Sequence, residues 1–168
     1  MNLLVLIFTV LSASSAVYLI SSTWNYLHFY PSLDQLQPFI PQVTLSGLST
    51  NQSRIEVKVI LENPQGYTGI TIVNVYTQLY FNTSSTSLFQ DHPLVTTQNP
   101  RIPLGGDGAT SFLVGYVLGQ NDTSTFTRFY NSNAGHITAH ATFTIRLSTF
   151  LDAASGQILL TREANGSL

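Results

Sequence analysis

Two histidines, His136 and His140, are the residues whose types and spacing first suggest chemistry. On a helix, a separation of four residues would place both imidazoles on one face, where they could ligate a metal ion. Here they lie in the run HITAHATFTIRLS, which alternates apolar and polar residues as a strand does. Four residues of strand separate two side chains by roughly 13 Å. One ion cannot bind both, so we expect surface roles and no metal site.

The other residues that could do chemistry form no catalytic set. The serines include no Gly-x-Ser-x-Gly elbow, and the eight Asp and Glu residues are spread along the chain. Asp107 lies in a Gly-Gly-Asp-Gly run that matches no EF-hand loop and lacks the Lys-Ser/Thr of a phosphate loop. The chain has no cysteine, which excludes a disulfide, a thiolate metal site and a cysteine nucleophile. We therefore predict a non-enzymatic protein without a cofactor.

Charge is scarce along the chain. Asp, Glu, Lys and Arg make up 8% of the residues, against about 25% in ordinary soluble domains. Ser and Thr, 38 residues in all, take their place together with 11 Asn and 8 Tyr. Only six residues are basic, too few to neutralise phosphates, so we expect no nucleic-acid partner.

The N-terminal segment predicts a membrane anchor. Leu3 to Ile20 reads LLVLIFTVLSASSAVYLI, and no residue before Asp34 is charged. A bilayer-spanning helix needs about 20 such residues. Aromatic residues then cluster where a helix would leave the hydrocarbon for the headgroups, and we expect them at the membrane interface: Trp24, Tyr26, Phe29 and Tyr30. The prediction is a single transmembrane helix over residues 1–30, with the lipid bilayer as its partner.

A cleavable signal peptide is the alternative. Ser14-Ser15-Ala16 offers small residues after an apolar run. Against cleavage, the segment lacks a basic region at its start, and the apolar run continues to Ile20. A buried core helix is less favoured because the segment has no polar face for water.

The orientation of the anchor depends on weaker signals. Neither flank carries Lys or Arg, so the positive-inside rule does not apply. Composition alone would give about 2.5 Asn-x-Ser/Thr sequons, and the chain has four, which we take as possible N-glycosylation sites in loops or at the C-terminus: Asn51, Asn82, Asn121 and Asn165. We therefore expect a cell-membrane protein with its globular domain outside the cytoplasm. Few charges and many Thr, Asn and Tyr would suit an archaeal envelope.

Strand patterns cover the rest of the chain. Residues 31–41 contain three prolines and read as a stiff linker, so the globular domain is predicted over residues 42–168. Residues 136–148 and 54–61 alternate strictly, and a bulge near Ile72–Val73 would explain a change of parity within 69–81. Further strands are expected at 42–47, 94–97, 110–118 and 157–161.

One short helix is predicted among these strands, at about 123–130. Asp122 could cap it, and Phe126, Phe129 and Tyr130 share one face. We expect it to close one end of the domain. With no alternation of strands and helices, the fold class predicted is all-β: an antiparallel sandwich of about seven strands, of the immunoglobulin or fibronectin III type.

Residues 41–162 resemble the group 2 late-embryogenesis-abundant domain, also called the water-stress and hypersensitive-response domain. The resemblance rests on RIEVKVILENP, which ends in Asn63-Pro64, and on GYTGITIVNVYTQLYFN, IPLGGDGATSFLVGYVL and GHITAHATFTIRL. It implies a fibronectin-like sandwich, often with an N-terminal membrane helix, and a binding or protective role in stress. It brings no catalytic residues.

Two classes of function remain open. The first is a membrane-anchored domain of this type that contributes to envelope integrity or stress tolerance by binding. The second is a structural subunit, either of a pilin-like surface filament or of a larger membrane complex. Against the pilin alternative, the chain lacks basic residues before its helix, and the proline-rich linker should interrupt the helix.

Overall fold

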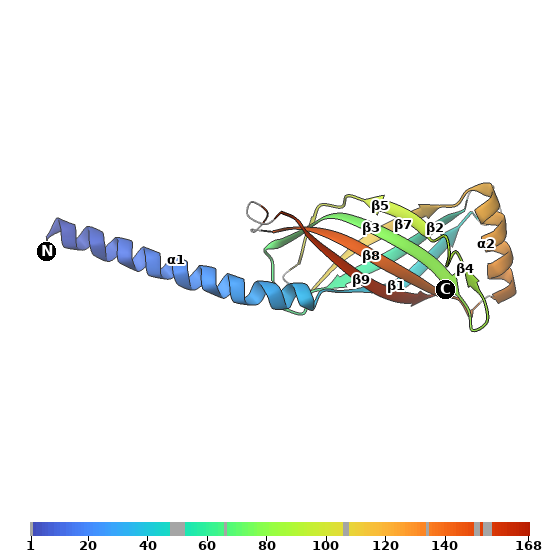
Figure 1. The fold of residues 1–168 in the computed structure, drawn as a ribbon, viewed down its shortest axis with the longest axis horizontal. Coiled ribbons are helices and arrows are strands. Elements are labelled where there is room, and N and C mark those ends of the chain that lie inside the picture. Colours follow the sequence, from blue (N-terminus) through green and yellow to red (C-terminus); the bar gives the residue numbers. More distant parts are fainter. Residues whose placement is uncertain are drawn as a thin grey trace.

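The protein consists of a long N-terminal helix joined to a β-sandwich, with a second helix across the far end of the sandwich (Figure 1). The computed structural model describes residues 2–47, 53–65, 67–105, 108–133, 135–149, 152 and 156–168. Asn51 and Asp107 lie outside this part of the chain.

The long helix, α1, covers Leu3–Asp34. All its residues up to Leu27 are exposed, while Phe29, Ser32 and Leu33 are buried. By length and composition α1 can cross a membrane, although a signal sequence would meet the same criteria. Its two ends thus have different surroundings: a free apolar shaft and a C-terminal turn packed into the domain.

The smaller sheet contains three antiparallel strands in the order β1-β2-β7. Their bounds are Gln37–Ser46 for β1, Arg54–Glu62 for β2 and Ala109–Val117 for β7. Alternation in β2 is as the sequence predicts: Ile55, Val57, Val59 and Leu61 are buried. Lys58 and the ends of the strand face solvent.

The larger sheet is built around β3, Ile70–Asn82, and β8, Thr138–Thr149. The strand β9, Ile158–Ser167, pairs with β8, and three short strands pair with β3: β4 (Ser87–Leu88), β5 (Leu94–Gln98) and β6 (Ile102–Pro103). The register between β3 and β8 shifts between Ile72 and Asn74, which confirms the predicted bulge. All these pairings are antiparallel.

The core lies between the two sheets. Its largest fully buried side chains include Phe81 and Phe143 from the larger sheet and Ile55 and Leu61 from the smaller one. The predicted all-β sandwich is therefore the observed fold, with nine strands in the described residues.

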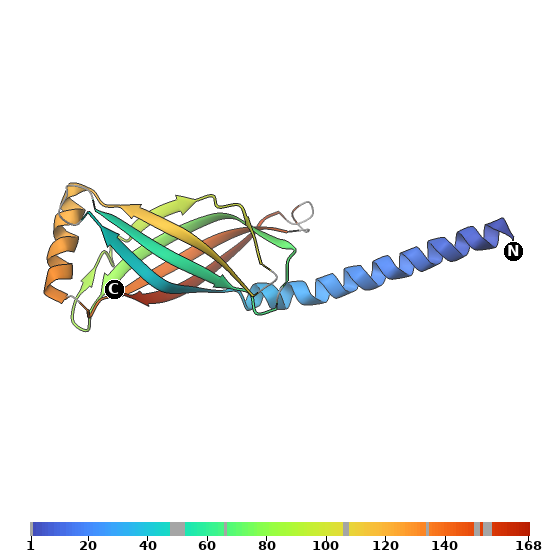
Figure 2. The same cartoon turned by 180° about the vertical axis from the view of Figure 1, so that it is seen from behind.

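The second helix, α2, covers Gln120–Asn133 and closes the end of the sandwich opposite α1 (Figure 2). Phe126 is fully buried, with its ring centroid 5.0 Å from that of Phe81 in an edge-to-face arrangement. The helix begins before the predicted residue 123, so Asp122 lies inside the first turn rather than at the cap.

The structure places helix and strand where the sequence predicts a linker over 31–41. α1 continues through Pro31 to Asp34, and β1 starts at Gln37. Proline is tolerated in β1 because this strand lies at an edge of its sheet. Pro38 keeps regular pairing with Leu61, and the register shift between Phe39 and Gln42 accommodates Pro41. Residues 31–41 therefore form the end of α1 and the first half of an edge strand, not a spacer.

Candidate functional site at the junction of helix and sandwich

The junction is the region where the end of α1 packs against the base of the sandwich. Phe29 and Leu33 are buried on one face of the last turns of α1, and Leu36, just beyond the end of the helix, is buried as well. The ring of Phe29 meets Tyr67 edge to face, with centroids 5.8 Å apart. The buried hydroxyl of Ser32 donates to the carbonyl of His28 at 2.7 Å, so no polar cost opposes this burial.

Arg162, on β9, holds the C-terminal end of α1. Its Nε donates to the carbonyl of Leu36 at 3.0 Å, and its Nη2 donates to the carbonyls of Leu33 and Asp34 at 3.2 and 3.0 Å. The last carbonyls of a helix have no partner within the helix, and its C-terminus favours a positive charge. Arg162 supplies both the donors and the charge.

A second polar contact joins the helix end to the loop between β2 and β3. The side-chain amide of Gln65 donates to that of Gln35 at 2.8 Å. The end of α1 thus contacts two parts of the domain: β9 through Arg162, and the loop between β2 and β3 through Gln65 and Tyr67. The helix and sandwich are therefore joined by side-chain contacts as well as by the chain itself.

A pocket of about 330 Å³ opens beside the junction. It is lined by both helix and loop residues: Trp24, Asn25, His28, Gln65, Tyr67, Thr68 and Gly69. The indole of Trp24 and the imidazole of His28 lie against each other with centroids 4.4 Å apart. Burial raises the pKa of Tyr67 above its ordinary value. The pocket joins aromatic faces with amides, which suits an amphipathic group better than a charged one.

Asn63 positions the loop that forms one wall of this pocket. Its side-chain amide donates to the carbonyls of Tyr67 and Gly105, at 2.9 and 3.0 Å, and its own side chain is fully buried. The sequence indicates only that Pro64 ends the preceding strand. The structure adds that Asn63 joins two loops far apart in the chain.

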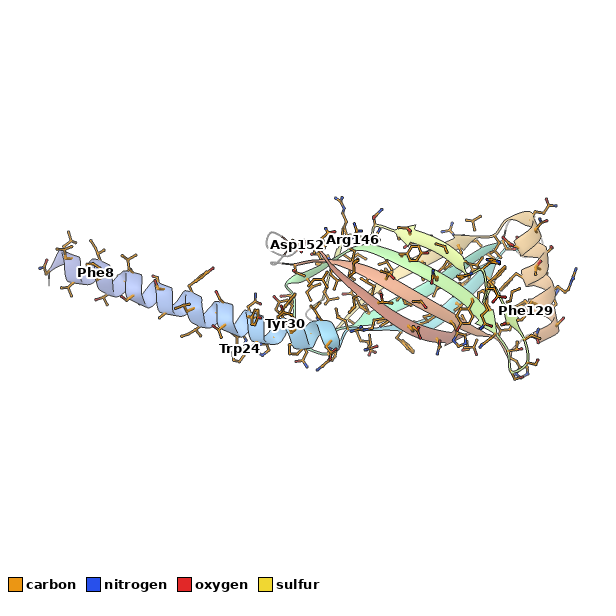
Figure 3. The ribbon with its side chains drawn as sticks, in the orientation of Figure 1. Phe8, Trp24, Tyr30, Phe129, Arg146 and Asp152 are labelled. Carbon is orange, nitrogen blue, oxygen red and sulfur yellow. The ribbon has the colours of Figure 1, made fainter. Side chains whose placement is uncertain are left out.

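Three of the four predicted interface aromatics lie on the exposed shaft of α1, and one does not. Trp24, Tyr26 and Tyr30 are at least half exposed, and Figure 3 shows Trp24 and Phe8 extending outward from the helix. Phe29 is 0% exposed and belongs to the core of the sandwich. Its assignment to the membrane interface is wrong, because the helix turns that residue toward the domain.

The predicted sequons have different surroundings. Asn121 is exposed in the first turn of α2, and Asn165 is exposed on β9 rather than in a terminal loop. Asn82 ends β3, and its Oδ1 lies 2.7 Å from Nε2 of His140. Asn51 is outside the described residues. Glycosylation of these asparagines stays a prediction.

Of the two histidines in the predicted strand, His140 lies on β8, whereas His136 precedes it. His140 is half-buried on β8, stacked on Tyr80 with ring centroids 4.9 Å apart, whereas His136 is exposed. In the described part of the chain, no three His, Asp or Glu side chains come together as metal ligands.

Arg162 and Tyr67 are the junction residues that sequence reasoning misses. Arg162 acts on residues 126 to 129 positions away, so no local pattern connects them. Tyr67 lies in a short loop without periodicity. Either residue could be predicted only if one already knew which strand and loop lie beside the end of the helix.

The chain matches no known family model, and no curated protein sequence matches it. Among solved structures, a protein from Archaeoglobus fulgidus is similar at 10% identity and a TM-score of 0.44, over 80% of this chain and 98% of that one. A protein from Arabidopsis thaliana is similar at 14% identity and a TM-score of 0.46, over 79% and 80%. A structure described as a late embryogenesis abundant protein also has 14% identity and a TM-score of 0.46, over 92% and 85%. At these values the likenesses do not establish a family.

Proposed function

We propose that the protein is a non-enzymatic, membrane-tethered binding domain of the late-embryogenesis-abundant type. In this proposal α1 crosses the bilayer once, and the sandwich lies outside the cytoplasm, where it contributes to envelope integrity or stress tolerance. The residue pattern around Asn63-Pro64 supports the domain type.

One observation carries the proposal: α1 is apolar and exposed up to Leu27, while its last turns are buried in the domain. Exposing the apolar side chains of such a long helix to water costs free energy, about 25 cal/mol per Å² of apolar surface. A helix fixed at one end and uncovered elsewhere needs an apolar surrounding, and a bilayer supplies one. The fixed end would then hold the sandwich at a constant height and angle above the membrane.

The absence of cysteine allows a direct test of topology, because any introduced cysteine is a unique label site. Asn165→Cys places a thiol on the exposed face of β9, and Asn2→Cys places one before the helix. Intact cells that express each variant are treated with a membrane-impermeant maleimide. The proposal expects labelling of Asn165→Cys at once and of Asn2→Cys only after lysis.

Two results would contradict the proposal, the first its orientation and the second the tether itself. Labelling of Asn2→Cys but not Asn165→Cys in intact cells would reverse the orientation. Mass spectrometry of the purified protein that finds residues 1–16 removed would identify the helix as a signal sequence. Wild-type protein, which has no thiol, is the control for unspecific labelling.

A second candidate, a structural subunit of a surface filament, is favoured by the continuity of α1. The sequence predicts that the proline-rich segment interrupts the helix, yet α1 passes through Pro31 and ends at Asp34, against the sandwich. A filament could cover the exposed apolar shaft with the shafts of other copies. An accessory subunit of a larger membrane complex would cover it with another protein.

Electron microscopy of the protein purified from native membranes separates the candidates. Filaments or a stoichiometric complex would support the structural subunit and contradict the independent domain. Monodisperse single copies would contradict the structural subunit. Either result leaves the orientation test above valid.

A further inference from the structure

The two long edges of the sandwich differ in how closely a strand of the larger sheet covers them. On one edge, β1 and β9 lie together: a Cβ added to Gly166 would come within 2.6 Å of the Ile40 side chain. On the other edge, β7 pairs with β2 and ends the smaller sheet. No strand in the described residues forms a hydrogen-bonded ladder with the far side of β7, although β5 lies close to part of it. The backbone of β7 thus offers hydrogen-bonding groups along one side.

β7 also lacks the features that normally protect an edge strand. Its sequence, ATSFLVGYV, contains no charge and no proline, whereas exposed edges usually carry one or the other to prevent pairing with another chain. Instead it presents two large apolar side chains to solvent, Leu113 at 59% and Val117 at 69% exposure. An unprotected edge of this kind is suited to receive a strand.

A groove of about 650 Å³ follows this edge. Ser111, Phe112 and Leu113 form its β7 side, and Gln98, Pro100 and Ile102 form the opposite side. Lys58, the only lysine in the chain, also lines it. We call this feature the β7 groove.

Lys58 gives the β7 groove a positive charge. It lies opposite Leu113 in the register of β2 and β7. The one ion pair in the described residues joins Arg54 and Glu56, at 2.8 Å, so no described carboxylate pairs with Lys58. An apolar groove with one uncompensated ammonium complements a segment that carries a carboxylate among apolar side chains.

We infer that the β7 groove is a docking site for an extended segment of another protein, which adds a strand to β7 and places an acidic side chain against Lys58. Main-chain hydrogen bonds would provide affinity, and the contacts with Leu113 and Lys58 would provide selectivity. This inference rests on the proposed binding function and names its surface and partner chemistry.

A second copy of the chain fits the β7 groove less well. β7 runs from the α1 end of the sandwich toward α2 (Figure 2). In a symmetric antiparallel pair of β7 strands, the two α1 helices would therefore point in opposite directions. Two copies held in one membrane could not form that pair.

The test uses the full chain in lipid nanodiscs and a random peptide display library. Peptides are selected on the wild type and depleted on Leu113→Lys, which introduces a charge at an exposed position of the groove. Leu159→Lys, on the exposed face of β9, is the matched control. We expect peptides that contain Asp or Glu among apolar residues, and on binding these should protect β7 amides from hydrogen exchange.

Charge reversal then tests the role of Lys58. Lys58→Glu should weaken the selected peptides about tenfold, equivalent to about 1.4 kcal/mol, and should favour peptides in which Lys replaces the acidic residue. Arg128→Glu on the exposed face of α2 changes the net charge equally and should leave affinity unchanged. Thermal unfolding of each variant serves as the control that the fold persists.

Three outcomes would overturn the inference. The first is a selection that yields no peptide sensitive to Leu113→Lys. The second is binding that Lys58→Glu does not change. The third is a wild-type dimer that Leu113→Lys dissociates and that the peptides do not displace, which would assign the edge to a second copy. None of these outcomes depends on the orientation of α1, so failure here is distinguishable from failure of the tether.

Discussion

At the scale of single residues, Asn63 shows why a buried polar side chain is kept in this core. Its amide satisfies the carbonyls of Tyr67 and Gly105, and its backbone N–H donates to the carbonyl of Gly108 at 2.7 Å. Buried carbonyls without a partner are costly, so one asparagine secures two loops that no strand pairing holds.

Asn63→Ala should lower the free energy of unfolding by about 2–4 kcal/mol, because it removes two buried hydrogen bonds and leaves their carbonyls unpaired. Denaturant unfolding of the full chain in detergent micelles measures the change. Asn99→Ala is the control: Asn99 is exposed, and its Oδ1 accepts a hydrogen bond from Asn74. A change of similar size in both variants would contradict the role assigned to Asn63.

Tyr116 is a second buried polar residue, with a different consequence. It is almost fully buried on β7, and burial raises its pKa well above the ordinary value of 10.0, an effect that the nearby Thr77 hydroxyl only partly offsets. Ionisation is therefore easier in the unfolded chain than in the folded one. Above pH 10 the unfolded chain releases the proton first, so stability is lost as pH rises.

Stability should thus decrease as pH rises above about 10, and Tyr116→Phe should make that decrease shallower. Unfolding free energies measured between neutral pH and pH 11 test this expectation. Below pH 9 the wild type and variant should show parallel pH dependence. An equal alkaline decrease in both proteins would show that Tyr116 does not titrate with unfolding.

At the scale of elements, periodicity predicts strands well and their ends poorly. β2 and β8 alternate strictly, and burial of one face enforces the register. β9 extends to Ser167, beyond the predicted residue 161, since Gly166 and Ala164 give little apolar signal. Their small size is instead what lets β9 approach β1, as Ile40 beside Gly166 shows.

The linker prediction was wrong for a related reason. Proline removes a backbone donor but excludes neither element here, because Pro31 lies inside α1 near its C-terminal end and an edge strand tolerates Pro38 and Pro41. Whether residues 31–41 form a spacer or part of the domain depends on burial of Phe29, Leu33 and Leu36. That burial involves strands more than a hundred residues away, such as β9, and it cannot be inferred from local composition.

Phe29 and Tyr30 test the packing of the end of α1 directly, because these neighbouring aromatic residues differ in burial. Phe29→Ala should lower the free energy of unfolding by about 3–5 kcal/mol by opening a cavity in the core. Tyr30→Ala, at a position 50% exposed, should change it by about 0.5 kcal/mol or less. Thermal unfolding of both variants under the same conditions is the measurement. Equal effects would contradict the burial of Phe29 in the sandwich.

At the scale of the whole molecule, the apolar helix and the sandwich form one body joined at the junction. Arg162 is the contact most specific to that arrangement, since it caps the helix from a distant strand. Arg162→Ala should lower stability by about 2 kcal/mol, and Arg162→Lys, which keeps the charge but loses the planar fork, should recover only part of it. Full recovery of stability in Arg162→Lys would show that the positive charge of Arg162 alone matters, and not its planar fork.

The most direct test of this account is a distance distribution between spin labels on α1 and on the far end of the sandwich. Tyr18→Cys and Asn121→Cys are exposed sites in a chain without other thiols, and pulsed electron paramagnetic resonance in lipid nanodiscs measures their separation. A junction held by Phe29 and Arg162 predicts a single narrow distribution, which Arg162→Ala broadens. A broad distribution in the wild type, as a flexible linker would produce, would contradict it.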